Sequence, residues 1–596
     1  MKNKSLCMLL SISLISFIGC HHDSVPLSAG ETVKPNIGYS VTKKSDDGYE
    51  KVHNTKLKDP YEKLKPNLNP NVPNHLKPHS RLVMTDVEDR TFFDFFAWQT
   101  FVGLVWPADT TYRGVPNRQI DAVDFSKFNT SNPTNPNRVP VVWETFRTFN
   151  DAFPVSKENP NAGPPEAWNG TKYKRPFTLD LTSKGNSHDN LNEAFSSVLI
   201  DQNRQYVRYN LGLNKVMYEF IRENKWYLKE NLPKSPTPAT LPPLVDPTTQ
   251  QATTISQPQT NTVIKQTVNG NSIEIKSAWR IMILKEDIKP HQTWKRADDL
   301  SKYFISKANV TDPVTGVIKK DVLVGLVGLH VVVKTPQFVQ GLWSSFEHVD
   351  NVKTPKGSGV RPSFHDETDT IYKQGFEYQP KRGTPLKKEE DRRPVGVSRT
   401  YKIPDTPVGT GKHLPDGLST AALNTTFQRL LKGTVWENYQ LVITQWPTDP
   451  TTFYPKPDLY PRSGYPYPEN GKDSVKNKKR NALALPAVKE AYARAVESAK
   501  NAYPRWSGLP LPQIGALNTT METYFQNPNP PTNGPNKGVR QPLENTSCMG
   551  CHYGASDTDY SWGLKLRTHP QPFNQGRVNA KDQALLMNYI ASSSKK

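Results

Sequence analysis

The stretch Cys548-Met549-Gly550-Cys551-His552 constrains this chain more than any other part of its sequence. Two cysteines three positions apart, followed at once by a histidine, have the spacing of a covalent haem-attachment site. On a short helical turn both sulfurs reach the two vinyl groups of one porphyrin, and the imidazole that follows binds the iron from below. We therefore predict one covalently bound haem c, held by Cys548 and Cys551, with His552 as the proximal iron ligand.

Two other kinds of site also use a pair of cysteines at this spacing. A structural zinc site needs a second pair of ligands, and the sequence contains no second CxxC. A thioredoxin-like redox pair belongs beside a βαβ pattern, which residues 541–547 do not show. Haem attachment is therefore the interpretation that the surroundings favour.

The beginning of the chain has the pattern of an export signal. Lys2 and Lys4 precede an apolar stretch, residues 6–18, that is too short to span a bilayer. It ends at Phe17-Ile18-Gly19-Cys20, which resembles the lipobox of bacterial lipoproteins and implies that Cys20 is acylated. Phe17 departs from the usual leucine, so an ordinary cleaved signal or an uncleaved one stays open.

This interpretation also accounts for every cysteine. Cys7 leaves with the signal, Cys20 carries lipid, and the remaining two carry haem, which leaves no thiol for a disulfide. Several acyl chains on one cysteine anchor a protein firmly without a transmembrane helix. The resemblance implies an exported lipoprotein that faces the periplasm or the cell surface. In the lipoprotein pattern an Asp directly after the acylated cysteine favours retention in the inner membrane. No Asp directly follows Cys20 in this chain, so the resemblance favours the outer membrane.

Composition and hydropathy divide the chain into four regions. Only 35% of residues are hydrophobic and 53 are proline, which indicates long irregular connections around a limited core. We predict a signal peptide over residues 1–19, a polar tether over 20–85, a β-rich body over 86–510 and a haem c-binding region over 511–596. A chain of 596 residues is too long for one small hydrophobic core, so two or three structural units are expected.

Within the body the sequence favours an α+β fold built on antiparallel sheet. Apolar spacing predicts a buried helix over 92–106, ended by Pro107, and further helices over 214–224 and 486–503. Alternation and β-branched residues predict strands over 139–149, 272–284, 322–333 and 435–446. Few helices separate these strands, which favours antiparallel pairing.

The haem region resembles the c-type cytochromes over about 50 residues. Asn579 can cap a closing helix in which Leu585 and Leu586 lie one turn before Tyr589 and Ile590. The resemblance implies a small helical haem unit at the end of the chain, and the wider pattern is similar to large bacterial cytochrome-like proteins with a single C-terminal CxxCH. Everything upstream lacks a counterpart in a small cytochrome c.

The sixth iron ligand stays open among several candidates. Small c-type cytochromes have a methionine before the closing helix, whereas this chain has His569 there. Ligation by two histidines lowers the reduction potential relative to His/Met ligation. Met521, on a strand-like stretch over 519–524, and Met587 are weaker candidates, and a water-bound or open iron is the remaining alternative.

A further group of polar residues follows a predicted strand of the body. His330 lies in an apolar run, and Glu347, His348 and Asp350 come shortly after it. If they met at one strand end they would form an acid/base pair or a metal site, although their spacing matches no defined metal motif. A lone histidine in an apolar strand is more often a hydrogen-bonded core residue.

These observations predict a lipid-anchored monohaem c-type cytochrome that transfers one electron at a time. The alternatives are a haem-dependent oxidoreductase with an open distal site, and a basic surface-binding lipoprotein with structural haem. The formal net charge of +20 suits an acidic redox partner or anionic lipid, while simple solubility explains it equally well. The sequence contains no nucleic-acid-binding motif. We expect a redox partner protein or a small-molecule substrate.

Overall fold

The computed structural model describes part of the chain. The residues described are 41–44, 50–52, 68–73, 90–120, 139–154, 163–169, 178–182, 191, 198–228, 231–232, 241–243, 255–257, 262–264, 268, 270–335, 341–352, 360–365, 386–399, 402–405, 419–445, 517–523, 552, 559, 561 and 563–564. The predicted helices over 486–503 and 579–590 lie outside these residues.

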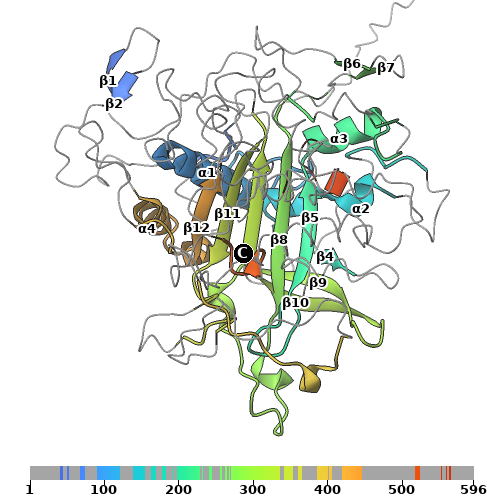
Figure 1. Cartoon of the computed structure of the whole chain (residues 1–596), viewed down its shortest axis with the longest axis vertical. Helices are drawn as coiled ribbons and strands as arrows, with labels where there is room; N and C mark the ends of the chain where they lie inside the picture. Colours follow the sequence, from blue (N-terminus) through green and yellow to red (C-terminus); the bar gives the residue numbers. More distant parts are fainter. Residues whose placement is uncertain are drawn as a thin grey trace, which may run out of the picture. The chain divides into compact units, whose positions relative to one another are not determined.

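One mixed sheet organises the described part of the body (Figure 1), where eight strands pair in the order β12-β11-β10-β8-β5-β3, with β9 beside β10 and β4 beside β9. All pairs are antiparallel except β4 with β9. The bounds are β3 (Arg147–Thr148), β4 (Thr178–Leu181), β5 (Arg208–Leu213), β8 (Ile273–Ile281), β9 (Ile305–Thr311), β10 (Ile318–Val333), β11 (Leu342–His348) and β12 (Tyr439–Gln445). The prediction of a β-rich α+β body is confirmed.

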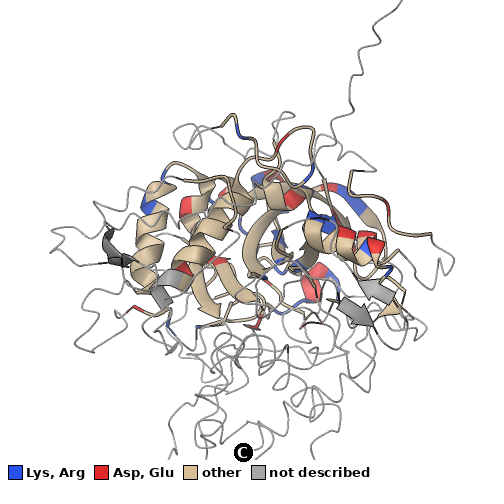
Figure 2. Ribbon diagram, turned by 90° about the horizontal axis from the view of Figure 1, so that it is seen from above, with Lys and Arg blue, Asp and Glu red and all other residues tan. Residues whose placement is uncertain are grey.

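Strand β10 is the centre of this sheet because it pairs with three others. Its whole second half pairs with β8 on one edge, and its other edge pairs first with β9 and then with β11. A long run of Val, Leu and Gly suits such a strand, since β-branched and apolar side chains pack well when both faces are covered. Figure 2 shows that ribbons at the centre of the described part are curved.

Helices α1 (Arg90–Val105) and α4 (Thr420–Leu430) cover β11 and β12. Trp98 of α1 stacks on Phe427 of α4 with ring centroids 4.9 Å apart, and Phe101 stacks on Phe346 of β11 at 4.4 Å. These aromatic pairs add to the free energy of apolar burial in the main core. The buried side chain of Asn424 in α4 joins this helix to α1 and β12. It accepts a hydrogen bond from Trp98 Nε1, and it bonds the backbone N–H and carbonyl of Leu441.

The remaining elements are shorter. They are β1 (Val41–Lys44), β2 (Glu50–Val52), the 3-10 helix η2 (Val142–Thr145), α2 (Phe149–Ala152), α3 (Lys215–Glu223), β6 (Ile255–Gln257), β7 (Thr262–Ile264), and the 3-10 helices η4 (Lys285–Asp287), η5 (Leu300–Lys302), η6 (Glu389–Asp391) and η7 (Val435–Asn438). Helix α3 begins as predicted, because Asn214 accepts a hydrogen bond from the backbone N–H of Met217.

Two of the four strand predictions need correction. Residues 139–149 form η2, the two-residue strand β3 and the start of α2. Residues 435–438 form η7, and only the second half of the predicted strand is β12. In both segments a side chain bonds the local backbone: Glu144 accepts from Val141 N–H and Thr434 from Trp436 N–H. Such local bonds compete with strand pairing.

Part of the predicted tether packs on the body. Leu68 and Val72 lie against the main core. A methyl group on Gly103 of α1 would lie 2.9 Å from the backbone nitrogen of Val72, so glycine permits this close approach. Among the residues that the structure describes, no helix combines the length and the apolar character needed to cross a bilayer.

Candidate haem-attachment site

The predicted haem ligands divide between described and undescribed residues. Cys548, Cys551, His569 and Met587 lie outside the described residues, as does the predicted lipidation site Cys20. His552 and Met521 are described. The surroundings of His552 therefore give the view of the predicted attachment site.

The imidazole of His552 packs against the sheet. Its ring centroid lies 4.3 Å from that of Trp343, with an angle of 58° between the ring planes. Trp343 is the second residue of β11 and is 7% exposed, whereas His552 is half-buried. The predicted proximal ligand thus has a tryptophan of the body as its immediate neighbour.

Trp343 belongs to a row of residues that crosses the sheet from strand to strand, here called the Trp343 row. Trp343 pairs with Val332, Val332 with Glu274, Glu274 with Leu213, and Leu213 with Arg147. Residues paired in this way lie side by side on neighbouring strands, about 5 Å apart. The row therefore marks one end of the sheet, where β10 ends and β8 and β11 begin.

The described residues of 552–564 contact this end of the sheet in strand order. The contacts run from His552 on Trp343 of β11, to Asp559 on Lys334 directly after β10, to Ser561 on Glu274 of β8, and to Gly563 on Phe149 directly after β3. A methyl group on Gly563 would lie 2.2 Å from Cε1 of Phe149, so this last contact requires glycine. Leu564 is fully buried in the main core.

A buried ion pair fixes the middle of this crossing. The side chains of Lys334 and Asp559 are 6% and 9% exposed, and Lys334 Nζ donates to Asp559 Oδ2. Lys334 also donates to the carbonyl of Leu241 at 3.0 Å, and Asp559 accepts from the backbone N–H of Leu241 at 2.6 Å. Burial lowers the pKa of Lys334 and raises that of Asp559, while each partner counteracts the shift of the other. The pair is stabilising only as long as both charges are present.

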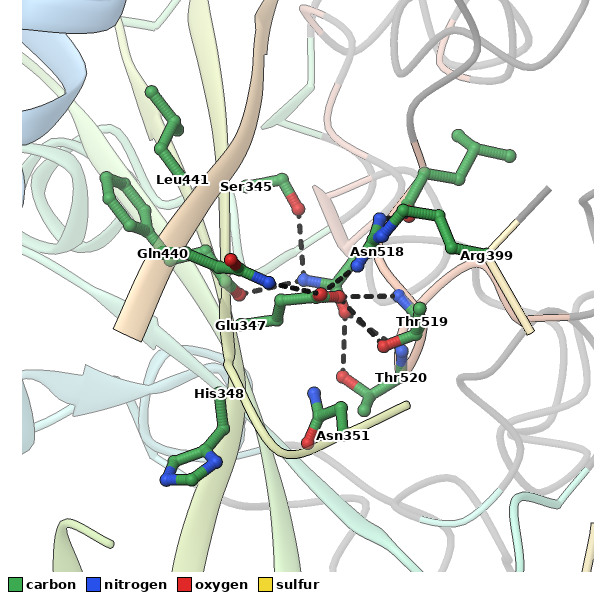
Figure 3. A network of polar contacts seen from close by, with 12 residues as sticks. Ser345, Glu347, His348, Asn351, Arg399, Gln440, Leu441, Asn518, Thr519 and Thr520 are labelled. Carbon is green, nitrogen blue, oxygen red and sulfur yellow. Dashed lines mark hydrogen bonds and ion pairs between the residues drawn. The ribbon is translucent and has the colours of Figure 1, made fainter. Parts of the chain in front are cut away.

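Residues 517–523 form a second contact with the sheet, close to the middle of β11 (Figure 3). The carboxylate of Glu347 is fully buried and accepts from Arg399, from Gln440 at 3.2 Å, and from the N–H and hydroxyl of Thr519 at 3.0 and 2.8 Å. Burial lowers the pKa of Arg399 to about 10, so the guanidinium stays charged at neutral pH. Glu347 is thus a structural anchor for residues 517–523.

Asn518 holds the same turn against β11 and β10. Its amide nitrogen donates to Ser345 Oγ at 3.0 Å and to the carbonyl of Phe346 at 2.8 Å, and its oxygen accepts from the N–H of Thr520 at 2.9 Å (Figure 3). A methyl group on Gly328 of β10 would lie 2.3 Å from Thr520 Oγ1. The glycine in the middle of β10 therefore lets this turn approach the strand.

Met521 lies in this turn and not in a strand, so the strand-like prediction for 519–524 is wrong for the described residues 519–523. It is 1% exposed and packs in a second core cluster with Val327 and Tyr209. Its methyl carbon would lie 3.3 Å from a methyl group on Gly328. This packing occupies the side chain that was predicted as a weaker iron ligand.

The four polar residues singled out around β10 and β11 do not form one cluster. Glu347 and His348 are consecutive in β11 and point to opposite faces (Figure 3). His330 lies opposite Ser345, on the face of Glu347, and its Nε2 lies 2.9 Å from Glu522 Oε1. Within the described residues, no three His, Cys, Asp or Glu side chains are placed to hold a metal ion.

His348 is a structural histidine. Its Nε2 lies 2.9 Å from the carbonyl of Lys302, and its Nδ1 accepts from the N–H of Asp350 at 3.1 Å, which fixes the proton on Nε2. The ring stacks on Tyr303 with centroids 4.0 Å apart. Burial lowers the pKa of His348 to about 4, so the ring is neutral at pH 7. Asp350 instead lies 3.5 Å from Lys302 Nζ.

This buried histidine predicts a pH dependence of stability. The unfolded histidine binds a proton below about pH 6.5, whereas His348 in the folded protein does so only below about pH 4. The free energy of unfolding should therefore fall as pH drops through this window, by about 3 kcal/mol in total. Urea denaturation at several pH values between 7 and 4 measures the free energy of unfolding, which should depend less steeply on pH in His348→Gln than in the wild type. The control His291→Gln, at an exposed position, should keep the pH dependence of the wild type. An unchanged pH dependence in His348→Gln would refute the assignment.

The donors at the end of the chain fit a covalently attached haem. Two thiols and an imidazole at positions 548, 551 and 552 are the set that attachment and proximal ligation require. The imidazole that the structure describes is half-buried beside an indole, which suits an iron ligand kept partly away from water.

Sequence reasoning did not find Trp343, Lys334 or Asp559. Nothing in the sequence pairs a lysine with an aspartate 225 positions later. One signal was present: a lysine directly after a Val-rich buried strand needs a partner if it is buried. Comparison with models of protein families, with curated proteins and with solved structures finds no match for this chain.

Proposed function

We propose that this protein is an exported, lipid-anchored monohaem c-type cytochrome that transfers one electron at a time. Cys548 and Cys551 form the thioether bonds, and His552 is the proximal ligand of the iron. The haem supplies a one-electron couple between Fe(III) and Fe(II). The rest of the chain positions that couple and presents it to a redox partner protein.

The observation that carries this proposal is the placement of His552. The described residues of 552–564 contact the same end of the buried sheet at four places, on β11 and β8 and directly after β10 and β3. The attachment motif is therefore followed by a segment with a defined position on the body. A fixed position favours electron transfer, because the distance to a docked partner is then reproducible.

The first test is the attachment itself. The Cys548→Ser/Cys551→Ser double variant, expressed in a cell competent for cytochrome maturation, should lose all covalently bound haem. Intact-mass spectrometry and the pyridine haemochrome spectrum measure this, and the wild type should carry one haem per chain. Met549→Leu is the matched control, since it alters the residue between the cysteines and spares the thiols. Wild-type protein without haem and with two free thiols would refute the proposal.

A second measurement separates electron transfer from haem catalysis. A low-spin ferrous haem that does not bind carbon monoxide has both axial positions filled and supports electron transfer. A haem that binds carbon monoxide has an open distal side and supports the oxidoreductase alternative. If the wild-type haem does not bind carbon monoxide and His569 is its distal ligand, the His569→Ala variant should bind carbon monoxide.

The anchor and the location are tested separately from the haem. Labelling with a radioactive fatty acid should mark the wild type and not Cys20→Ser, and membrane fractionation should place the labelled protein in the outer membrane. The net charge of +20 predicts that complex formation with an acidic redox partner weakens as salt is raised.

A further inference from the structure

We infer that Trp343 is a positioning residue for the His552 imidazole, so that strand β11 of the body forms part of the proximal side of the haem. This inference rests on the proposed attachment of haem at Cys548 and Cys551. It goes further by giving a named residue of the body a defined task in setting the haem's properties. The body then acts as more than a support on which a separate haem unit is carried.

The indole of Trp343 has a fixed position. Trp343 pairs with Val332 of β10 on one side and with Gln445 of β12 on the other, so its backbone lies inside the sheet. A methyl group on Gly341 would lie 3.1 Å from Trp343 Nε1, which shows how closely the chain before β11 packs on the ring. A backbone paired on both edges, together with a ring that packs closely on the preceding residues, makes a rigid support.

The position of His552 relative to this support is also fixed. Seven residues after His552, Asp559 forms the buried ion pair with Lys334, which directly follows β10. Val332, two residues before Lys334, is the partner of Trp343 in the sheet. The ion pair and the ring contact are therefore neighbours at one end of the sheet, and together they hold the segment that bears the imidazole.

An apolar ring beside an iron-ligating imidazole changes the stability of the two oxidation states. Groups around the first ligands control the access of water, and hence the reduction potential. Removing the indole admits water beside His552, and water favours the more highly charged Fe(III) state. The reduction potential of a Trp343→Leu variant should therefore fall.

Potentiometric titration of the purified holoprotein measures this effect. We expect the equilibrium constant for electron exchange with a reference couple to change at least tenfold in Trp343→Leu, which corresponds to 59 mV for one electron. The ferric EPR spectrum should also show a second set of g-values, because an unsupported imidazole adopts more than one orientation. The amount of covalent haem per chain should stay that of the wild type.

Trp436→Leu is the matched control. Trp436 is 1% exposed, and it packs on Phe304 and Phe101 in the main core, away from the Trp343 row. Its replacement should lower thermal stability and leave the potential and the EPR spectrum unchanged. If Trp343→Leu does not yield folded protein, Trp343→Phe should give a smaller shift of the same sign.

A measurement without haem tests the contact itself. In the full-length Cys548→Ser/Cys551→Ser variant with labelled histidine rings, the ring-current field of Trp343 should displace the His552 signal, and Trp343→Leu should abolish this displacement. An undisplaced signal overturns the inference, as does a wild-type potential in both Trp343 variants. Absence of haem from the wild type would instead refute the proposed function, so the two failures are distinguishable.

Discussion

Replacing Glu347 with glutamine is expected to destabilise the protein by about 3–5 kcal/mol, because it removes one partner of a buried ion pair. Glutamine has nearly the same shape, so the hydrogen bonds to Thr519 largely persist. The guanidinium of Arg399, whose side chain is 13% exposed, then loses the carboxylate with which it pairs in the described part of the chain. Urea denaturation at pH 7 measures the change in the free energy of unfolding.

Two variants show whether the lost charge is the cause. Glu437 is a partly exposed glutamate that accepts one long hydrogen bond, 3.4 Å from Gly433 N–H, and Glu437→Gln should change stability by less than about 0.5 kcal/mol. Glu347→Gln combined with Arg399→Met should recover most of the loss, since Thr519 keeps its acceptor and no unpaired charge is left buried. A loss below about 1 kcal/mol in Glu347→Gln would place the pair among weak surface ion pairs.

The Asp559→Asn variant is expected to release the described residues of 552–564 from the end of the sheet. Among the described residues, Lys334 then keeps the carbonyl of Leu241 as the partner of its buried ammonium group, and we expect a loss of about 3–5 kcal/mol. Amide hydrogen exchange should speed up between His552 and Leu564 before it does so in β8, because the contact opens locally. Mass spectrometry of peptides from this region measures the exchange.

Asp321→Asn is the matched control for this variant. Asp321 is exposed and has φ of 55°, close to the 56° of Asp559, so both substitutions place asparagine in the same left-handed backbone region. Its stability should change by less than about 0.5 kcal/mol. Adding Lys334→Met to Asp559→Asn should restore protection, and slow exchange in Asp559→Asn alone would contradict a role for the ion pair.

Periodicity predicted those parts of the fold in which one local pattern dominates. Helix α1 and strand β10 were recognisable because long apolar runs leave little choice of conformation. Residues 139–149 were assigned to a strand because Val and Trp favour sheets, yet Glu144 caps a 3-10 turn there. Helix α4 has mixed polar and apolar residues and was missed, although Ser419 caps it. Propensity alone does not reveal such a bond.

In the candidate site, too, some features follow from a local sequence pattern and others do not. The proposed haem ligands at 548, 551 and 552 are suggested by their spacing, since haem attachment needs those residue types in that order. The contacts of His552 and Asp559 are with Trp343 and Lys334, which lie more than 200 positions earlier in the sequence. The periodicity of a single sequence does not predict such long-range pairs. His330, Glu347 and His348 illustrate the converse error. They are near in sequence and strand pairing, yet His348 bonds Lys302, while His330 and Glu347 bond two different residues of the turn 517–523, Glu522 and Thr519.

The described residues of 517–523 and 552–564 bond β11, the end of β10 and β8, so these contacts form only after more than 500 residues have been synthesised. Contacts between residues so far apart in sequence form late and slow the folding of a chain. The contacts that residues 517–523 make with β11 are therefore among the last of the described contacts to form. A polypeptide released before residue 517 would lack the bonds of Asn518 to β11 and would leave the buried ammonium group of Lys334 without Asp559.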